Sequence, residues 1–468
     1  MKAIFDELLK NIPDYKAFLT AREMDESSID LAKNYPDSVK LLNIGKSRAG
    51  SELYCLKIGS DEQKPNALLL GCPHPNEPIG AMMLEYLSLQ LAKDEALRDA
   101  FGYNCYILKA WDYDGLCMNE GWLKGPFTIE QYAKNMYRPA NHLQVDWTFP
   151  VKHRDYEFNA VLPETEAVMK LIDEIKPKFI YSLHNAGFGG VYWYISEAMP
   201  ADVYEKMANS TERQGVPLHM GEPEVPIVLE LAPAIYRMGE ITELYDFLYE
   251  NMGPEAAGFL GMGHNSAGYG KGVCGAYSLL TELPFFFDDR ISDLTPSSMK
   301  KGNCRLINLD IIDECNNEVL SLIEWAEGSI SQDNPFYATL LTFIQFENTG
   351  AQREMAAVSE DKDDISTEAE VFSMTIEPLF YKLLSFGMLT RMFEYELGSD
   401  AGASLDSERK KKLNDLKDDA AKLFKRYSEK LLEQLNYETV PIKKLVTIQL
   451  ESGLIISQKL LSSFTDFS

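Results

Sequence analysis

A short apolar segment that runs into a histidine and a glutamate constrains this chain more than any other part of it. Residues 66–71 are mostly apolar, as in a buried strand, and the loop that follows carries His74 and Glu77. Pro78 stands where a helix would begin, and residues 79–92 continue with apolar side chains at helical spacing. The pattern predicts a strand, a tight loop and a helix, with an imidazole and a carboxylate on one side of the loop.

Two later segments also end in a polar side chain of this kind. The strand-like residues 178–183 are followed at once by His184, and residues 276–281 lead into Glu282. Because such strands alternate with helices, we expect an α/β fold with a mixed, mostly parallel sheet covered by helices on both faces. Ligands bind beyond the carboxyl ends of the strands in these sheets. We therefore expect His74 to lie near both later side chains, on one edge of the sheet.

Two histidines and one glutamate, with one position left to water, form the ligand set of a catalytic zinc site. The His-x-x-Glu spacing alone is weak evidence, since a lone histidine is more often structural than a metal ligand. The partners at two other strand ends make a metal site the better interpretation. His264, in the glycine-rich residues 261–270, could line the pocket. The remaining histidines lack such a context, and Cys72 is expected to be a small buried side chain.

Several other elements can be predicted from the pattern of apolar residues. The chain up to residue 36 is expected to be helical, residues 39–44 and 52–58 to form a hairpin, residues 103–109 a strand, and residues 163–175 a helix. These assignments extend the strand–helix alternation over the first part of the chain.

The length of 468 residues exceeds one ordinary core, so we expect more than one unit. Residues 1–330 are predicted to form the α/β domain with the candidate site, and residues 331–468 an α-helical domain with a role in packing or oligomerisation. Within the second unit, the acidic residues 359–370 suggest an exposed loop or linker. Residues 407–435 have the spacing of a long amphipathic helix.

Charge and cysteine content exclude several classes of protein. The net charge of −27 argues against nucleic acid or an anionic membrane surface as a partner. The 7 cysteines include no Cys-x-x-Cys pair, which indicates neither a disulfide framework nor a thiolate zinc site. The chain shows no apolar signal segment and no apolar run long enough to cross a bilayer, so a cytoplasmic protein is predicted. The oligomeric state stays open.

Five ordered motifs together resemble the M14 zinc carboxypeptidase family, from about residue 38 to residue 289. They are His74-x-x-Glu77, Asp112-Tyr-Asp-Gly115, Gln144-Val-Asp-Trp-Thr-Phe-Pro150, Leu183-His184-Asn185 and Leu280-Thr-Glu-Leu-Pro284. The long separation between Glu77 and His184 is also similar to that of the family. The resemblance implies a carboxypeptidase-like fold and a metallopeptidase activity.

The resemblance also implies a role for each site residue. His74, Glu77 and His184 would hold Zn²⁺, which makes hydroxide available from water at neutral pH and polarises the scissile carbonyl. Glu282 would take the proton from that water and pass it to the leaving nitrogen. Asp146 would accept a hydrogen bond from the first ligand histidine, His74, and so orient it.

Two further residues are candidates for contact with the substrate. Arg138 would stabilise the oxyanion, the alternative being an ordinary ion pair with a surface acid. Tyr269 could fill the role of the family's mobile tyrosine, although its distance from Glu282 along the chain is not a clean match.

The chain departs from the family pattern where typical members bind the carboxylate of a free C-terminus. The family's Asn-Arg pair is absent after Asp146, where Trp147 and Thr148 follow, and Asn76 stands in a position that is often arginine. Recognition of a free C-terminus is therefore in doubt. Asn76 is also similar to the asparagine in the His-Gly-Asn-Glu motif of aspartoacylase and desuccinylase deacylases.

The leading hypothesis is a zinc-dependent hydrolase of peptide or amide bonds. The alternative within hydrolases is a deacylase of small N-acyl amino acids, which should ignore oligopeptides. A third hypothesis is an inactive peptide-binding module that works through its helical domain, although a decayed site would rarely keep both histidines and both glutamates. A serine or cysteine hydrolase is disfavoured because no Gly-x-Ser-x-Gly motif is present.

Overall fold

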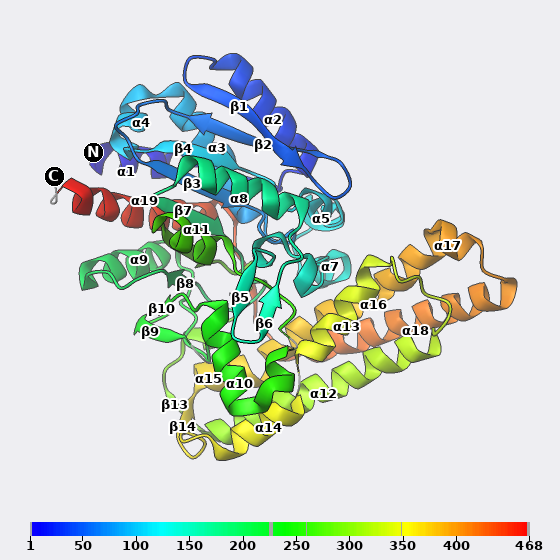
Figure 1. Cartoon of the computed structure of the whole chain (residues 1–468). Helices are drawn as coiled ribbons and strands as arrows, with labels where there is room; N and C mark the ends of the chain where they lie inside the picture. Colours follow the sequence, from blue (N-terminus) through cyan, green and yellow to red (C-terminus); the bar gives the residue numbers. More distant parts are fainter. Residues whose placement is uncertain (1, 224–227, 259, 348, 466–468) are drawn as a thin grey trace.

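A mixed sheet of nine strands forms the centre of the protein (Figure 1). The computed structural model describes residues 2–223, 228–258, 260–347 and 349–465. The strand order is β1-β2-β4-β3-β7-β11-β8-β10-β9. The strands are β1 (Val39–Lys46), β2 (Glu52–Ile58), β3 (Asn66–Gly71), β4 (Asn104–Leu108), β7 (Phe179–Leu183), β8 (Tyr192–Ile195), β9 (Leu229–Ala232), β10 (Ile235–Arg237) and β11 (Tyr277–Glu282).

The sheet is parallel in its centre and contains antiparallel pairs on both sides. Strands β4, β3, β7 and β11 run parallel to one another. β1 and β2 form the predicted antiparallel hairpin, β2 is antiparallel to β4, and β8 is antiparallel to β11. Towards the other edge, β10 is parallel to β8 and antiparallel to β9. The mixed sheet is thus confirmed, and β3, β7 and β11 end at the same edge.

Helices cover both faces of this sheet, as predicted. Alternate residues of the central strands point to opposite faces, so Leu69 and Tyr181 belong to one apolar core and Leu68 and Ile180 to another. The first core contains residues of α1 (Lys2–Lys10), α2 (Ala21–Asn34), α3 (Ile79–Lys93), α4 (Glu95–Phe101), α9 (Ala201–Gln214) and α19 (Ile442–Thr465). The second core packs against α8 (Pro163–Ile175) and α11 (Ser266–Cys274).

The connections between the strands contain several short elements and one longer helix, α10. They are α5 (Tyr113–Cys117), α6 (Glu120–Leu123), α7 (Ile129–Asn135), the 3-10 turns η1 (Asn141–Leu143) and η2 (Val145–Trp147), the hairpin β5 (Val151–His153) and β6 (Tyr156–Phe158), α10 (Ile241–Gly258), and η3 (Asp289–Ser292). The turn η2 and the loop after α7 matter most here, because they bring residues to the edge where the parallel strands end.

A long helical region follows the sheet and lies on one side of it (Figure 1). The chain enters through β12 (Phe286–Phe287) and returns through β15 (Glu438–Thr439), and these two strands pair with each other. Between them lie β13 (Pro296–Lys300), α12 (Lys301–Trp325), α13 (Pro335–Phe346), α14 (Thr349–Val358), β14 (Ile365–Thr367), α15 (Glu368–Thr375), α16 (Glu377–Gly398), α17 (Asp400–Ala403) and α18 (Ser407–Leu432).

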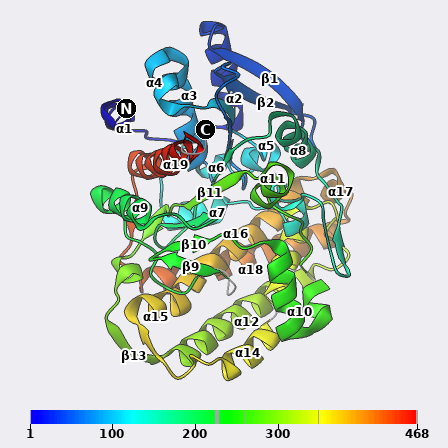
Figure 2. The same ribbon diagram turned by 60° about the vertical axis from the view of Figure 1, so that its left-hand side comes forward.

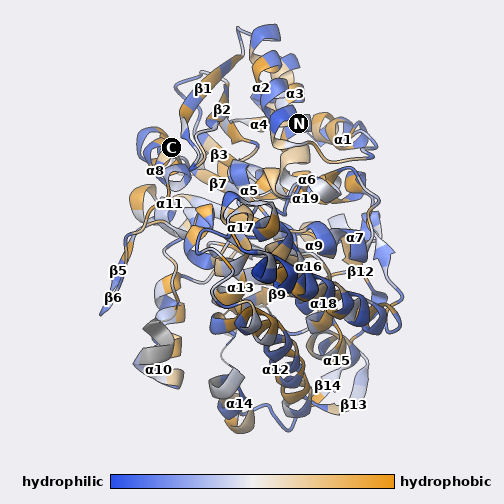
Figure 3. Cartoon of the chain, turned by 90° about the vertical axis from the view of Figure 1, so that its right-hand side faces the viewer, coloured by the Kyte–Doolittle hydropathy of each residue, from blue (hydrophilic) through white to orange (hydrophobic). Residues whose placement is uncertain are grey.

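Helix α16 forms the middle of this region. It packs against α12, α13 and α18, and also against α7 of the sheet unit; Figure 2 shows α12, α16 and α18 side by side. The predicted amphipathic helix is confirmed as α18, which buries Leu413, Ala420 and Leu431 and presents a hydrophilic outer face (Figure 3). The acidic stretch 359–370 was expected to be a loop throughout, but from Ile365 it forms β14 and the start of α15. Its Ser366 and Ala369 are buried, because β14 pairs with β13 and α15 packs on α12.

The last helix, α19, returns to the sheet and packs against α3 and α9. The predicted division of the chain at residue 330 stays a proposal about folding units, and these contacts place α19 next to the sheet rather than among the preceding helices. Among the helices of the described residues, none combines the length and the apolar character that crossing a bilayer requires.

Candidate metal centre

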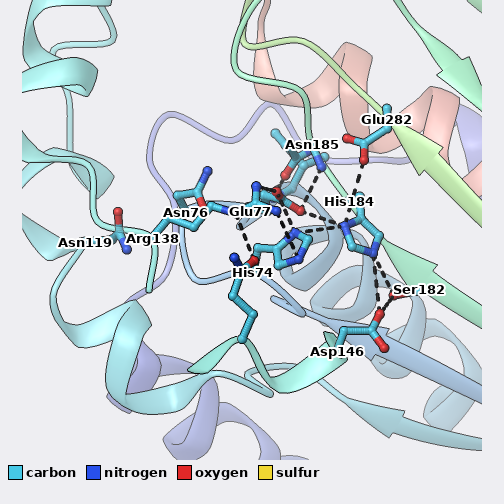
Figure 4. Close-up of polar contacts among 12 residues, drawn as sticks. His74, Asn76, Glu77, Asn119, Arg138, Asp146, Ser182, His184, Asn185 and Glu282 are labelled. Carbon is cyan, nitrogen blue, oxygen red and sulfur yellow. Dashed lines mark hydrogen bonds and ion pairs between the residues drawn. The ribbon is translucent and has the colours of Figure 1, made fainter. Parts of the chain in front are cut away.

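The structure brings His74, Glu77 and His184 together at the edge where β3 and β7 end (Figure 4). His74 Nδ1 lies 3.0 Å from Glu77 Oε1, and His184 Nδ1 lies 3.0 Å from Glu77 Oε2. The two Nδ1 atoms are 3.2 Å apart. The three residues are 3%, 1% and 2% exposed. Two imidazoles thus point the same ring nitrogen at one buried carboxylate.

Local backbone contacts shape the loop that carries His74 and Glu77. Cys72 is buried and adopts a positive φ of 50°, which turns the chain sharply after β3. Its carbonyl accepts a hydrogen bond from the N–H of Asp112, at 3.0 Å. The N–H of Glu77 then donates to the carbonyl of His74, at 3.1 Å, and α3 begins after Pro78. The sequence therefore yields the strand, loop and helix that were predicted.

Asn185 joins this loop to the end of β7. Its backbone N–H donates to Glu77 Oε2 at 3.2 Å, and its Oδ1 accepts from the N–H of Ile79 at 3.0 Å. The start of α3 also lies very close to β7, since a Cβ added to Gly80 would be 2.3 Å from the Cβ of Leu183. The sequence analysis included Asn185 in a motif but gave it no role, because its two contacts are visible only in three dimensions.

Ser182 and Asp146 contact the outer ring nitrogen of His184. Nε2 of His184 lies 2.9 Å from Ser182 Oγ and 3.7 Å from Asp146 Oδ2, and Ser182 Oγ donates to Asp146 Oδ2 at 2.9 Å. The N–H of Ser266, at the start of α11, donates to the other oxygen of Asp146 at 2.6 Å. The expectation that Asp146 orients His74 was wrong: these bonds hold its carboxylate on the β7 side, next to His184.

Arg138 occupies the position beside His74 instead. Its Nη2 lies 3.1 Å from His74 Nε2, its Nη1 lies 3.1 Å from Glu77 Oε1, and its Nε donates to Gln144 Oε1 at 3.0 Å. The guanidinium also lies over the ring of Trp147, 5.2 Å from its centroid. The rings of Trp147 and His74 meet edge to face at 5.1 Å. The sequence marked Trp147 as a departure from the family but could not predict that it packs on both residues.

Glu282 approaches the same side of His184 as Glu77 does. Its Oε1 lies 3.9 Å from His184 Nδ1, and its side chain is 12% exposed (Figure 4). Glu282 is the last residue of β11, which is the strand next to β7, and Thr281 of β11 is paired with Leu183 of β7. A second carboxylate therefore faces His184 Nδ1 while keeping some access to solvent.

Burial and charge set the ionisation of the cluster. Burial, together with the nearby Arg138, lowers the pKa of His74 to about 4. Burial acts in the same direction on His184, but the carboxylate of Glu77 outweighs it and raises the pKa of His184 to about 10. Burial would raise the pKa of Glu77, but the two imidazoles hold it below its usual range. The cluster thus pairs the Glu77 carboxylate with one positive charge, which a bound proton supplies. A metal cation could replace that proton.

The other candidate residues lie outside this cluster. Asn76 is buried, and its Nδ2 donates to the hydroxyl of Tyr132 at 3.0 Å. Tyr269 donates its hydroxyl to Asp173 of α8 at 3.2 Å. His264 Nδ1 lies 3.8 Å from Glu240. A contact with substrate stays a prediction for all three residues.

The donor set fits Zn²⁺. Two ligands of a tetrahedral ion at ~2.05 Å lie about 3.3 Å apart, close to the 3.2 Å between the two Nδ1 atoms. The ligand atoms all fall within 4.8 Å of one another. The contact of His184 Nε2 with Ser182 and Asp146 matches the outer support that histidine ligands usually have. With three protein ligands, a fourth position remains for water.

Residues 24–219 match the sequence model of the zinc carboxypeptidase family, M14. This range contains the three candidate ligands, Arg138 and Asp146, and it ends before Glu282. No match is found among curated proteins.

Three solved structures are similar in part. Carboxypeptidase A from Helicoverpa armigera is 16% identical, over 61% of this chain and 71% of its own, with a TM-score of 0.39. Bovine thrombin-activatable fibrinolysis inhibitor, in complex with tick carboxypeptidase inhibitor, is 15% identical over 57% and 86%, with a TM-score of 0.34. A metallo-carboxypeptidase from Burkholderia cenocepacia is 15% identical over 57% and 60%, with a TM-score of 0.33.

Proposed function

We propose that this chain, of which residues 24–219 match the M14 zinc carboxypeptidase family, is a divergent member of that family and a zinc-dependent hydrolase of peptide or amide bonds. The observation that supports this most is the arrangement of ligand atoms. His74 Nδ1, His184 Nδ1 and a Glu77 oxygen lie within 4.8 Å of one another, and Glu282 Oε1 is 3.9 Å from His184 Nδ1. A ligand set and a separate carboxylate thus share one small volume.

We assign His74, Glu77 and His184 as the zinc ligands. When bound there, Zn²⁺ supplies Lewis acidity, which lowers the pKa of a water molecule to about 7 and polarises a carbonyl. Asp146 and Ser182 hold His184 so that its Nδ1 faces inward.

Glu282 acts in this proposal as the general base. It takes a proton from the attacking water and delivers it to the leaving nitrogen, which explains why a carboxylate is needed in addition to the ligand Glu77. Its partial exposure leaves it accessible to water.

Arg138 stabilises negative charge that develops on the carbonyl oxygen. In the structure it donates towards His74 Nε2. When Nδ1 of His74 is a ligand, the proton of the neutral ring lies on Nε2, and the contact becomes one between two donors. Arg138 would then lose its favourable contact with the ring, while Glu77 and Gln144 would still hold the guanidinium beside the site.

The absence of the family's Asn-Arg pair after Asp146 leaves the substrate class open between peptides and small N-acyl amino acids. Asn76, the residue that favoured a deacylase, turns its amide towards Tyr132 rather than the cluster. This supports the peptide hydrolase over the deacylase. A cytoplasmic location remains part of the proposal.

The test is a comparison of wild type with Glu282→Gln on oligopeptides and on N-acyl amino acids, with metal content measured in parallel. We expect Glu282→Gln to keep its metal and lose at least 99% of turnover, a factor of about 10². Glu451→Gln serves as a control and should leave turnover unchanged, since Glu451 is a partly exposed residue of α19 that pairs with Arg213. Wild-type turnover in Glu282→Gln would refute the assigned role. Cleavage of N-acyl amino acids alone would favour the deacylase. Bound metal without any hydrolysis would favour the inactive binding module.

A further inference from the structure

Helix α19 places a polar patch against the strands that carry the candidate metal centre. The patch consists of Gln449, Ser452 and Gly453, which share one face of the helix because they are three and four residues apart. All three are buried, and their neighbours Leu445, Val446 and Ile448 belong to the apolar core. A buried amide among apolar side chains is unfavourable unless it is hydrogen-bonded, so its contacts are informative.

Gln449 contacts the backbone of a proposed metal ligand. Its Nε2 donates to the carbonyl oxygen of His184 at 3.3 Å. The opposite orientation of the amide would place two acceptors, Oε1 and this carbonyl, against each other. The donor role of the side chain at this carbonyl is therefore fixed by its partner.

The backbone of Gln449 continues the contact to the strand of Glu282. Its carbonyl accepts a hydrogen bond from the hydroxyl of Tyr181 at 2.8 Å, and the oxygen of that hydroxyl lies 2.7 Å from Thr281 Oγ1. Because the Tyr181 proton goes to Gln449, the hydroxyl of Thr281 is the donor in the second bond. Thr281 immediately precedes Glu282, so one helix residue is linked to both strand ends.

The helix can make these contacts only because it lies very close to the sheet. A Cβ added to Gly453 would be 2.7 Å from Cε1 of Tyr181, so a larger residue would push the helix away. Ser452 Oγ accepts from Trp193 Nε1 of β8 at 3.0 Å, which fixes the helix along the strands.

We propose that Gln449 is a positioning residue for the metal centre, and that α19 fixes the end of β7 relative to the end of β11. His184 is thereby held at the distance from Glu282 that the chemistry needs. The inference builds on the proposed function and extends it to a helix far outside the family-matched residues 24–219. The last helix of the chain thus belongs to the metal centre in function, although the long helical region separates the two in sequence.

The first test compares Gln449→Met with Gln458→Met in the full-length protein. Both substitutions remove a glutamine that donates to a backbone carbonyl from α19, and Gln458 donates to Phe101 at 3.1 Å, at the end of α4. Zinc affinity is measured by chelator competition, and the geometry of the site by the visible spectrum of the Co²⁺-loaded protein. We expect Gln449→Met to weaken zinc binding about tenfold and to shift the Co²⁺ bands, while Gln458→Met changes neither.

A second readout does not depend on metal. Hydrogen exchange of the backbone amides of residues 179–185 should become faster in Gln449→Met and stay at the wild-type rate in Gln458→Met. If Gln449→Met fails to fold, Tyr181→Phe removes the hydroxyl and keeps the ring, and the same changes are expected from it. Equal affinity, spectrum and exchange in Gln449→Met and wild type would overturn the inference. If wild type bound no zinc, only the proposed function would be refuted. The positioning role of Gln449 would still be tested by the hydrogen-exchange experiment, which does not need metal.

Discussion

The substitution Gly80→Ala tests how closely the candidate metal ligands depend on the packing of α3 against β7. Gly80 lies in the first turn of α3, three residues after Glu77, and Leu183 immediately precedes His184. The added Cβ would be 2.3 Å from the Cβ of Leu183, whereas carbon atoms in contact are about 3.5 Å apart. The two segments would have to separate by about 1 Å, and with them the two ligands.

Two effects on stability oppose each other in this variant. Alanine is favoured over glycine in a helix by up to about 1 kcal/mol, and less near the helix start. Overpacking of a tight core contact costs about 1–3 kcal/mol. We expect the overpacking to win, with a net loss of about 1–2 kcal/mol in the free energy of unfolding. Because metal sites tolerate changes of only about 0.2 Å in ligand distances, zinc affinity should fall at least tenfold.

The assays are urea unfolding and zinc competition, with Gly272→Ala as the matched control. Gly272 lies in α11, and an added Cβ there would meet nothing within 4 Å. This control should gain about 0.5–1 kcal/mol and bind zinc as wild type does. If Gly80→Ala were as stable as wild type and bound zinc equally well, the close contact between α3 and β7 would not be what sets the ligand geometry.

Two further predictions concern buried ionisable groups that are not candidate metal ligands. Burial raises the pKa of Asp112 to about 7, although the positive charge of Arg48 acts in the opposite direction. The folded protein therefore binds one more proton than the unfolded chain between about pH 4 and pH 7, and its stability falls as the pH rises through that range. Urea unfolding should show that, between about pH 4 and pH 7, the free energy of unfolding of wild type falls by up to about 4 kcal/mol relative to that of Asp112→Asn. A stability difference between the two proteins that does not change with pH would contradict this. In the helical region, Lys382 is buried and pairs with Glu347 and Asn316. Lys382→Met should lower the free energy of unfolding by about 2–3 kcal/mol, which is less than for a fully buried pair because Glu347 is partly exposed. Zinc affinity should stay unchanged. A variant as stable as wild type would show that the pair contributes nothing to stability.

The grouping of the candidate site residues could be predicted because each of them follows a local pattern. His74, His184 and Glu282 each stand at the end of an apolar strand, and parallel strands that are neighbours end at one edge. No knowledge of side-chain orientation was needed for this step. The helix at residues 163–175 was predicted with the bounds that α8 has, because Pro163 and Glu164 mark its start.

The contacts that support the candidate ligands could not be predicted, because they depend on which way side chains turn. Ser182 and Asp146 are far apart in sequence and meet only because η2 packs next to β7 and α11. For the same reason Asp146 was assigned to the wrong histidine. Asn185 and Trp147 stood in recognised motifs, but their contacts join different segments of the chain.

The path of the chain after Glu282 could not be predicted from the sequence either. Strands β12 and β15 have two residues each, too short to leave a periodic pattern, yet their pairing brings the chain back to the sheet after the helical region. The predicted α-helical region over residues 331–468 includes α19 (Ile442–Thr465). The sequence did not indicate that the helix packs next to His184, since the partner surface is distant in sequence.

The metal content of the purified protein tests the central claim most directly. Wild type and His74→Ala would be analysed for bound elements after dialysis against zinc and removal of free metal. The account predicts one zinc ion per chain in wild type and little in His74→Ala, with the fold of the variant retained by circular dichroism. Wild type without bound metal would contradict the account, since the carboxylate and the two imidazoles would then form only a buried ion pair.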